Sequence, residues 1–341
     1  MPHTVLVTGA TGFIAKHIVL QLLNAGHSVI GSVRSLDREA ELRDAIAPHL
    51  NDPAALDRLR VIALDLTRDD GWAEAMQGVD ALMHTASPFP MVQPKDEDEL
   101  IRPAVDGALR ALRAAHVAGV HRVILTSSVA AVTNTDLPPD RTAFTEADWT
   151  DPDHPASTPY VKSKTLAEKA AWDFVVKEAP EIQLTTINPS LVLGPPLDGN
   201  YGTSIQVIER LLHATDPMLP EVGFSVVDVR DIAAMHVAAL DRPDTAGNRY
   251  IGSEQFVWFV ELAQMLKRAH PDRKVVTRKA PGFVIRLLAL FDPSIRSILP
   301  SLGQRIELSA DRAREELGID FTSAEDAVHA TAAWLVANRV V

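Results

Sequence analysis

The chain has 341 residues, of which 46% are apolar and 23% are charged, and its formal net charge is −12. This composition is typical of a globular protein with a sizeable core. The acidic balance, without a basic stripe, argues against nucleic-acid binding. Because the chain has no cysteine, disulfide bonds and thiolate metal sites are excluded.

The N-terminal region begins with a strand-like run and shows no charged and apolar leader segment. The apolar run at residues 283–291 is too short to span a membrane and contains Arg286. We interpret this run as part of the core. We therefore expect a cytoplasmic protein with no membrane partner.

Up to about residue 190, short apolar runs alternate with helical patterns. This alternation predicts βαβ units, and hence a doubly wound α/β domain of the Rossmann type with a parallel sheet covered on both faces. The predicted strands are residues 5–7, 28–33, 61–64, 81–84, 123–126 and 183–187, and the predicted helices include residues 15–25 and 99–118.

After Pro189 the pattern changes, and Gly, Pro and Asn become frequent. We expect residues 1–190 to form the Rossmann domain, joined by returning segments at about 224–242 and 305–341. Residues 191–223 and 243–304 are expected to form a smaller C-terminal substrate lobe.

A glycine-rich turn links the first predicted strand to the first predicted helix. Gly9 allows the tight turn, Gly12 lets a pyrophosphate approach the backbone, and the small Ala15 lets helix and strand pack closely. Free amides and the helix dipole then hold the anion. A turn without a ligand is the alternative, but its place in a βαβ unit favours a dinucleotide site. The turn comprises Thr8, Gly9, Ala10, Thr11, Gly12, Phe13, Ile14 and Ala15.

The end of the second predicted strand indicates which dinucleotide is bound. A carboxylate that would accept a hydrogen bond from a ribose 2′-hydroxyl is missing there, and Arg34 follows the strand instead. A planar guanidinium suits a 2′-phosphate, so we expect NADP(H), with Arg38 or Arg43 as a second contact. A surface arginine without a ligand is the alternative. Asp65, at the end of the third strand, either accepts from the adenine amino group or caps the following turn.

Tyr160 and Lys164 lie four residues apart at the start of a predicted helix. Residues at this spacing share one helix face, and an ammonium near a phenol lowers the pKa of the phenol toward the range useful for proton transfer. Ser127 and Ser128 follow the strand at 123–126, at the edge of the sheet where ligands bind. One of these hydroxyls can donate to the oxygen of a substrate carbonyl.

This combination resembles the extended short-chain dehydrogenase/reductase superfamily. Within it, the chain is most similar to the dihydroflavonol reductase, cinnamoyl-CoA reductase and yeast methylglyoxal or aldehyde reductase group. The matching stretches are residues 8–15, 31–35, 84–89, 125–128, Tyr160 with Lys164, and 188–195, with a weaker match at 228–231.

The resemblance implies an NADPH-dependent reductase of aldehydes or ketones. It implies that Ser128 is the catalytic serine, that Tyr160 is the proton donor and that Lys164 binds the nicotinamide ribose. Arg34 matches the arginine with which the group binds the 2′-phosphate. Members of the group have a further lysine as a second phosphate contact, and Glu41 stands near the place of that lysine in this chain. The residues expected to line the cofactor are Thr8, Gly9, Thr11, Gly12, Phe13, Ile14, Arg34, Asp65, Leu66, Thr85, Ala86, Ser87, Thr126, Tyr160, Lys164, Pro189 and Val192.

Pro88, Phe89, Ser128 and Tyr201 are expected to line the substrate pocket. The apolar character of the pocket segments favours neutral, hydrophobic carbonyl compounds. The group also implies a monomer or a homodimer, and no histidine spacing suggests a metal.

Two other functions remain open at this stage. A sugar-nucleotide epimerase or dehydratase shares the fold. Dehydratases of the superfamily resemble one another in an Asp-Glu pair directly after the catalytic hydroxyl residue, whereas Val129 and Ala130 follow Ser128 in this chain. A non-catalytic NADP-sensing protein is the second alternative, and such relatives usually lose the tyrosine or the lysine.

Overall fold

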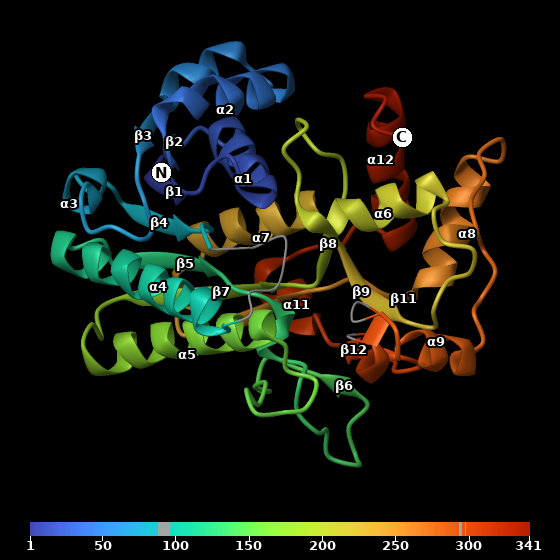
Figure 1. Ribbon diagram of the computed structural model, residues 1–341. Helices are drawn as coiled ribbons and strands as arrows, with labels where there is room; N and C mark the ends of the chain where they lie inside the picture. Colours follow the sequence, from blue (N-terminus) through green and yellow to red (C-terminus); the bar gives the residue numbers. More distant parts are fainter. Residues whose placement is uncertain (88–95, 293–294, 297) are drawn as a thin grey trace.

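The computed structural model describes residues 1–87, 96–292, 295–296 and 298–341 (Figure 1). Its central sheet has seven strands, all parallel, in the order β10-β7-β5-β4-β1-β2-β3. The doubly wound α/β fold predicted from the sequence is thus confirmed. The strands are β1 (Thr4–Thr8), β2 (Ser28–Val33), β3 (Leu59–Ala63), β4 (Ala81–His84), β5 (Arg122–Thr126), β7 (Gln183–Pro189) and β10 (Arg249–Gly252).

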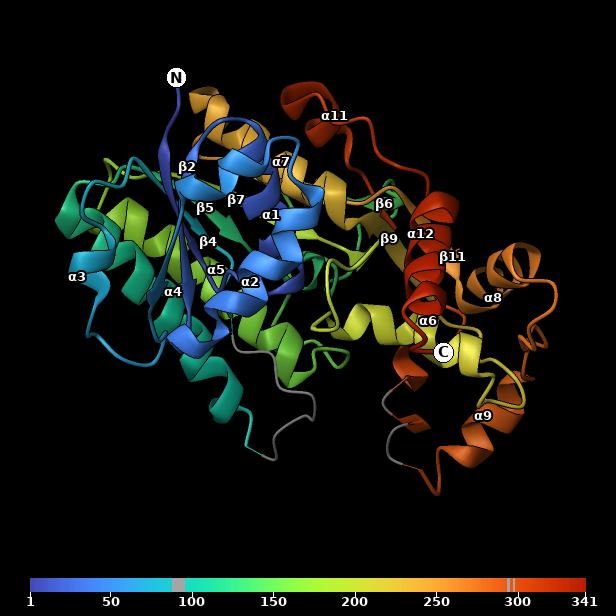
Figure 2. The same ribbon diagram turned by 90° about the horizontal axis from the view of Figure 1, so that it is seen from above.

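Helices cover both faces of this sheet, as Figure 2 shows from above. In β1, Val5 and Val7 face the core beneath α1 and α7, and Leu6 faces the core beneath α4 and α5. Both sets are fully buried, because a strand sends alternate side chains to opposite faces. The helices of the two layers are α1 (Phe13–Asn24), α2 (Glu39–Ile46), α7 (Val229–Asp241), α3 (Trp72–Ala75), α4 (Asp98–Ala118) and α5 (Pro159–Lys177).

A smaller lobe lies beside the carboxyl ends of the strands (Figure 1). Its sheet has the order β11-β9-β8, and α6, α8 and α12 pack around it in one apolar core. A further two-stranded sheet joins β6 and β12. The lobe elements are β8 (Leu191–Leu193), β9 (Gly223–Asp228), β11 (Gln255–Trp258), α6 (Thr203–His213), α8 (Phe259–Ala269) and α12 (Ala324–Ala337). The remaining elements are β6 (Ala143–Phe144), α9 (Gly282–Leu288), β12 (Glu307–Leu308) and α11 (Asp311–Leu317).

The structure differs from the expected division of the chain in two places. The expected lobe segment 243–304 contains β10, which pairs with β7 and extends the main sheet. The expected returning segment 305–341 is shared between the two parts of the molecule. Helix α11 packs on β10 and α7 of the main domain, whereas α12 packs on α6 and α8 of the smaller lobe. Strand β10 is short and stands between turns, so its place in the sheet depends on its pairing with β7 and not on a local pattern.

The apolar run at residues 283–291 is not core, contrary to our interpretation. Ile285 is buried, but Phe283 is 74% exposed and Phe291 is 81% exposed. A helix as short as α9 turns only one narrow stripe toward its neighbours. Among the described residues, no helix combines the length and the hydropathy that a membrane span requires.

Candidate active site

The carboxyl ends of β1 and β4 are joined through the side chain of Thr8. Its hydroxyl accepts hydrogen bonds from the amides of Thr85 and Ala86, both at 3.1 Å. The same hydroxyl lies 2.9 Å from Nδ1 of His84 and, with both amides already bound, donates its proton there. These hydrogen bonds fix Thr85 and Ala86, which follow β4, against Thr8 at the end of β1. All three residues are expected to line the cofactor.

The glycine-rich turn has the geometry of a phosphate cradle. Gly9 has φ +64°, and a Cβ atom added to it would lie 2.9 Å from the Cβ of Ala86, so both its backbone and its contacts require glycine. Gly12 is the N-cap of α1 and has no side-chain cap. The first amides of α1 therefore have no capping side chain, which is the arrangement that binds anions. Phe13 and Ile14 begin α1 and pack against the core.

Arg34 follows β2 directly and its side chain is exposed. Of the two arginines considered as second contacts, Arg38 forms a bidentate pair with Glu41, at 2.8 and 2.9 Å. Arg43 donates to Glu39 at 2.7 Å and to the carbonyl of Leu59 at 2.9 Å. In this structure Arg43 is thus held by α2 and β3, and Arg34 is the exposed cation after the strand.

Asp65 caps the turn that follows β3. Its Oδ1 accepts from the amide and the hydroxyl of Thr67, both at 2.8 Å, and these bonds lower the pKa of the carboxyl. Arg34 also stabilises this carboxylate electrostatically. Asp65 therefore caps the following turn, and its contact with an adenine amino group stays a prediction. Leu66 packs against α4 at Gly107.

A buried lysine ties the glycine-rich turn to the loop after β8. Lys16, 1% exposed, pairs with Asp198 and lies 3.4 Å from Glu41. Asn200 donates to Glu41 at 2.8 Å and to the carbonyl of Thr11 at 3.1 Å. We call these four side chains the Lys16 cluster. No local pattern predicts this cluster, because its members come from three distant segments.

Ser128 and Tyr160 come together at the carboxyl end of β5, and Lys164 lines a small pocket there with Thr126 and Ser127. The side chains of Ser128 and Tyr160 are hydrogen-bonded to each other. Ser128 also accepts from the amide of Ala130 at 3.1 Å. Thr158 caps α5 through the amide of Val161, and Tyr160 therefore stands in the first turn of α5, with Lys164 one turn further on.

The pKa values of the two helix residues are shifted in opposite directions. Burial raises the pKa of Tyr160, and the hydrogen bond with Ser128 partly opposes this shift. Burial lowers the pKa of Lys164 to about 8, against the opposing effect of Glu168. The expected lowering of the phenol pKa by Lys164 is therefore not observed here. Loss of hydration outweighs the hydrogen bond with Ser128 and raises the pKa of Tyr160, so the phenol is held in its protonated form.

A carboxylate that the sequence analysis missed lies behind these residues. Glu168 is 1% exposed and accepts hydrogen bonds from Ser127 at 2.5 Å and from Asn188 at 2.7 Å. Arg249 donates to it at 2.7 Å. Its spacing of four residues from Lys164 was the available signal. Its partners from β7 and β10 were not visible in the local pattern.

The remaining residues expected near the nicotinamide lie at the ends of β5, β7 and β8. Thr126 donates to Nε2 of His236 at 2.7 Å, so its hydroxyl is engaged with α7. Pro189 ends β7 and Val192 is 7% exposed in β8. Between them, the buried hydroxyl of Ser190 has no hydrogen-bond partner within the described part of the chain.

The expected substrate residues are only partly described. Pro88 and Phe89 lie outside the described residues. The phenol of Tyr201 donates to Glu209 at 3.2 Å, and its ring packs edge-on against Trp334 with centroids 5.8 Å apart. These contacts hold Tyr201 within the smaller lobe. Ser128, which is also expected to contact the substrate, is hydrogen-bonded to Tyr160.

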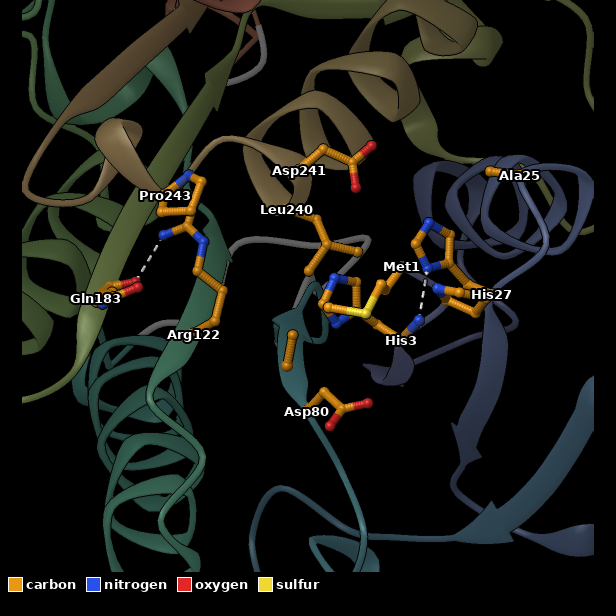
Figure 3. Close-up of a pocket in the computed structure, with 12 residues that line it drawn as sticks. Met1, His3, Ala25, His27, Asp80, Arg122, Gln183, Leu240, Asp241 and Pro243 are labelled. Carbon is orange, nitrogen blue, oxygen red and sulfur yellow. Dashed lines mark hydrogen bonds between the residues drawn. The ribbon is translucent and has the colours of Figure 1, made fainter.

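A wider hollow of about 680 Å³ lies at the opposite, amino-terminal edge of the sheet (Figure 3). There the guanidinium of Arg122 donates to the carbonyls of Gln183 at 2.7 Å and Ala239 at 2.6 Å. His3 donates through its amide to His27 at 3.1 Å. These contacts join strand and helix ends, and ligands of parallel α/β sheets bind at the other edge. We therefore assign this hollow no part in the active site.

In the described ranges, no group of three or more His, Cys, Asp or Glu residues is arranged to hold a metal ion. At the carboxyl edge, the glycine-rich turn offers backbone amides, Ser128 and Tyr160 offer hydroxyls, and Arg34 and Lys164 supply positive charge. This set suits a nucleotide and a carbonyl oxygen better than a cation.

Comparison with known proteins agrees with this geometry. Residues 5–251 match the model of the NAD dependent epimerase/dehydratase family, and the chain belongs to this family. It is 32% identical to the NADPH-dependent methylglyoxal reductase GRE2 of Saccharomyces cerevisiae, over 80% of this chain and 84% of that one. It is 34% identical to cinnamoyl-CoA reductase 1 of Petunia hybrida, over 81% and 80% of the two chains.

A solved structure is similar over nearly the whole chain. The yeast methylglyoxal/isovaleraldehyde reductase Gre2, complexed with NADPH, superposes with a TM-score of 0.82 at 27% identity. The similarity covers 99% of this chain and 100% of that one. The smaller lobe is thus part of the shared fold.

Proposed function

We propose that the chain reduces neutral, hydrophobic aldehydes or ketones to alcohols, with hydride from NADPH and with Tyr160 as the proton donor. The broader class is an oxidoreductase that uses NADP(H), in line with relatives named as NADPH-dependent reductases and with the NADPH complex of Gre2. The hydrogen bond between Ser128 and Tyr160, with Lys164 one helical turn away, is the observation that supports the finer proposal best.

The residues of the cleft suit NADP(H). Gly9 leaves no room for a side chain beside Ala86, and the uncapped start of α1 offers amides to the pyrophosphate. Arg34 offers a planar cation to the 2′-phosphate. The hydroxyl of Ser190, next to Pro189, has no hydrogen-bond partner among the described residues and is available to the nicotinamide end. When bound, NADPH supplies the hydride.

Tyr160 and Ser128 then act on the carbonyl oxygen of the substrate. Both hydroxyls donate to this oxygen and so stabilise the negative charge that grows on it as the carbonyl carbon accepts the hydride. The proton of Tyr160 passes to the oxygen and completes the alcohol. Lys164 faces the resulting phenolate and stabilises its charge until solvent returns a proton.

The carbonyl as the reacting group is inferred from the named relatives, and a neutral, hydrophobic substrate from the apolar sequence segments that are expected to form the pocket. The named relatives are reductases of methylglyoxal, isovaleraldehyde and cinnamoyl-CoA, and these compounds have a carbonyl group in common. Val129 and Ala130 after Ser128 supply no carboxylate for the acid and base steps of an elimination. A carbonyl reductase therefore fits these residues better than a dehydratase.

The test is NADPH consumption with a panel of hydrophobic aldehydes and ketones, followed by identification of the products. Nucleotide sugars form the comparison arm. We expect an alcohol in an amount equal to the NADPH consumed. Conversion of a nucleotide sugar without net consumption of cofactor, and no reduction of any carbonyl, would overturn the proposal.

A further inference from the structure

Three side chains follow one another along a single face of α5. Tyr160, Lys164 and Glu168 are spaced four residues apart, and residues at this spacing lie one above the other on a helix. The first two reach the cleft. The third points into the protein, where its side chain has no exposed surface.

Glu168 has a hydrogen-bond partner for each carboxylate oxygen. Oε2 accepts from Ser127 at 2.5 Å and Asn188 at 2.7 Å, and Oε1 accepts from Thr186 at 3.0 Å and Arg249 at 2.7 Å. We call these residues the Glu168 cluster. A buried carboxylate requires such complete pairing, because an uncompensated charge in the core is strongly unfavourable.

Arg249 supplies the compensating charge. Its guanidinium carbon lies 3.7 Å from the centre of the Trp149 ring, and its remaining N–H groups donate to the carbonyls of Glu146 at 2.9 Å and Asp148 at 2.7 Å. The cation is thus fixed by the loop before α5. The position of the Glu168 carboxylate is fixed in turn.

Two members of the cluster act on the catalytic segment. Ser127 is the neighbour of Ser128, and Asn188 donates a second hydrogen bond to the carbonyl of Ser128 at 3.1 Å. Through Ser127 and Asn188, the Glu168 carboxylate thus fixes the backbone before and after the Ser128 side chain. The Ser128 hydroxyl in turn contacts Tyr160.

Glu168 and Lys164 also line one small, partly open cavity. The cavity measures about 20 Å³, which is room for one water molecule. Glu168 stabilises the charged form of Lys164 electrostatically, whereas His84 is held uncharged by burial. The cavity is lined by His84, Ala86, Ser87, Ala104, Ala108, Leu125, Thr126, Ser127, Lys164, Ala167 and Glu168.

We propose that Glu168 is a positioning residue that fixes Ser128 against Tyr160 and supplies the negative charge that faces Lys164 from the core. This inference rests on the proposed roles of Tyr160 and Lys164. Glu168 touches no reacting atom. It acts through Ser127 and Asn188 on one side and through the charge of Lys164 on the other.

The test compares Glu168→Gln with Asp173→Asn, which makes the same change on the exposed side of α5, where Asp173 pairs with Lys177. For Glu168→Gln we expect the alkaline limb of the kcat profile to move to lower pH by roughly one unit, because the ammonium loses its stabilising anion. Asp173→Asn is expected to match the wild type. A kcat profile of Glu168→Gln whose alkaline limb stays in place would overturn the role of the charge.

Asn188→Ala tests the positioning role separately, and remains informative if Glu168→Gln does not fold. It cuts the link to Ser128 and leaves the Glu168–Arg249 pair in place. We expect kcat to fall severalfold with the alkaline limb unmoved and the affinity for NADPH, measured by fluorescence titration, unchanged. An unchanged kcat would contradict the positioning role. If the wild type reduces carbonyls and these variants behave like it, the inference fails but the proposed function does not.

Discussion

Lys16 of the first helix and Asp198 of the loop after β8 form an ion pair at the glycine-rich turn, although 182 residues separate them. The Lys16 side chain is 2% exposed and that of Asp198 is 22% exposed. Through Asn200, the same loop holds the carbonyl of Thr11. A loop of the smaller lobe is thereby fastened to the segment expected to bind the cofactor.

Asp198→Asn removes the main anion from this buried ammonium. Breaking a buried pair leaves an uncompensated charge, and Glu41 at 3.4 Å offsets only part of it, so we expect a loss of stability of about 1–3 kcal/mol. Thermal unfolding checks this prediction. Asp37→Asn, at an exposed position, is the control. Equal melting temperatures for the two variants would show that the pair contributes nothing to stability.

Arg34→Ala tests the cofactor preference. Hydrogen bonds to a charged group contribute about 1.5–3 kcal/mol, so the KM for NADPH is expected to rise roughly tenfold or more. The KM for NADH should change little, because NADH has no 2′-phosphate. Arg102→Ala, which removes another exposed arginine, is the control. Equal effects of Arg34→Ala on both cofactors would exclude contact between Arg34 and the 2′-phosphate.

The pH dependence of reduction should follow Lys164. Reduction requires a proton on Tyr160, whose pKa is raised by burial, and a charge on Lys164, whose pKa is lowered to about 8 by burial. Activity is therefore expected to be complete below pH 8 and to fall as the pH rises through this value. The measurement is kcat at saturating NADPH from neutral to alkaline pH. A flat profile through pH 8 would disagree with a role for the ammonium.

Three buried histidines should make the protein sensitive to mild acid. Burial lowers the pKa of His84 to about 3 and those of His17 and His236 to about 4, from an ordinary value of 6.5. Below pH 6.5 the unfolded chain therefore binds protons that the folded chain does not bind. Stability is complete above pH 6.5 and is lost progressively as the pH falls toward 4.

The melting temperature as a function of pH measures this loss. His236→Gln retains a polar side chain that can accept from Thr126 and removes one titrating group, so its melting temperature should fall less steeply with acid. His154→Gln, on a loop before α5, is the comparison and should follow the wild type. A slope for His236→Gln equal to that of the wild type would contradict the assignment.

The sequence predicted the parts of the fold and site that depend on local patterns. The turn at Gly9 and Gly12 follows from backbone geometry, and the spacing of Tyr160 and Lys164 follows from the helix period. The strand at Ser28–Val33 has the predicted bounds, because its apolar run ends where the turn residues begin.

The parts that the sequence did not predict depend on distant partners. Glu168 resembles any helical glutamate until Arg249 from β10 is brought beside it. Lys16 looks like a surface lysine until the loop at Asp198 covers it. The pKa of Tyr160 was expected to fall because its charged neighbour was visible in the sequence and its burial was not.

The most direct test of the whole account is Tyr160→Phe, with NADPH binding and carbonyl reduction measured on the same preparation. The substitution removes one hydroxyl and keeps the ring, so NADPH should bind as it does to the wild type. Loss of a general acid costs about 10²–10⁴-fold in rate, and kcat is expected to fall within or beyond this range. Undiminished reduction by Tyr160→Phe would contradict the assignment of Tyr160 as the proton donor.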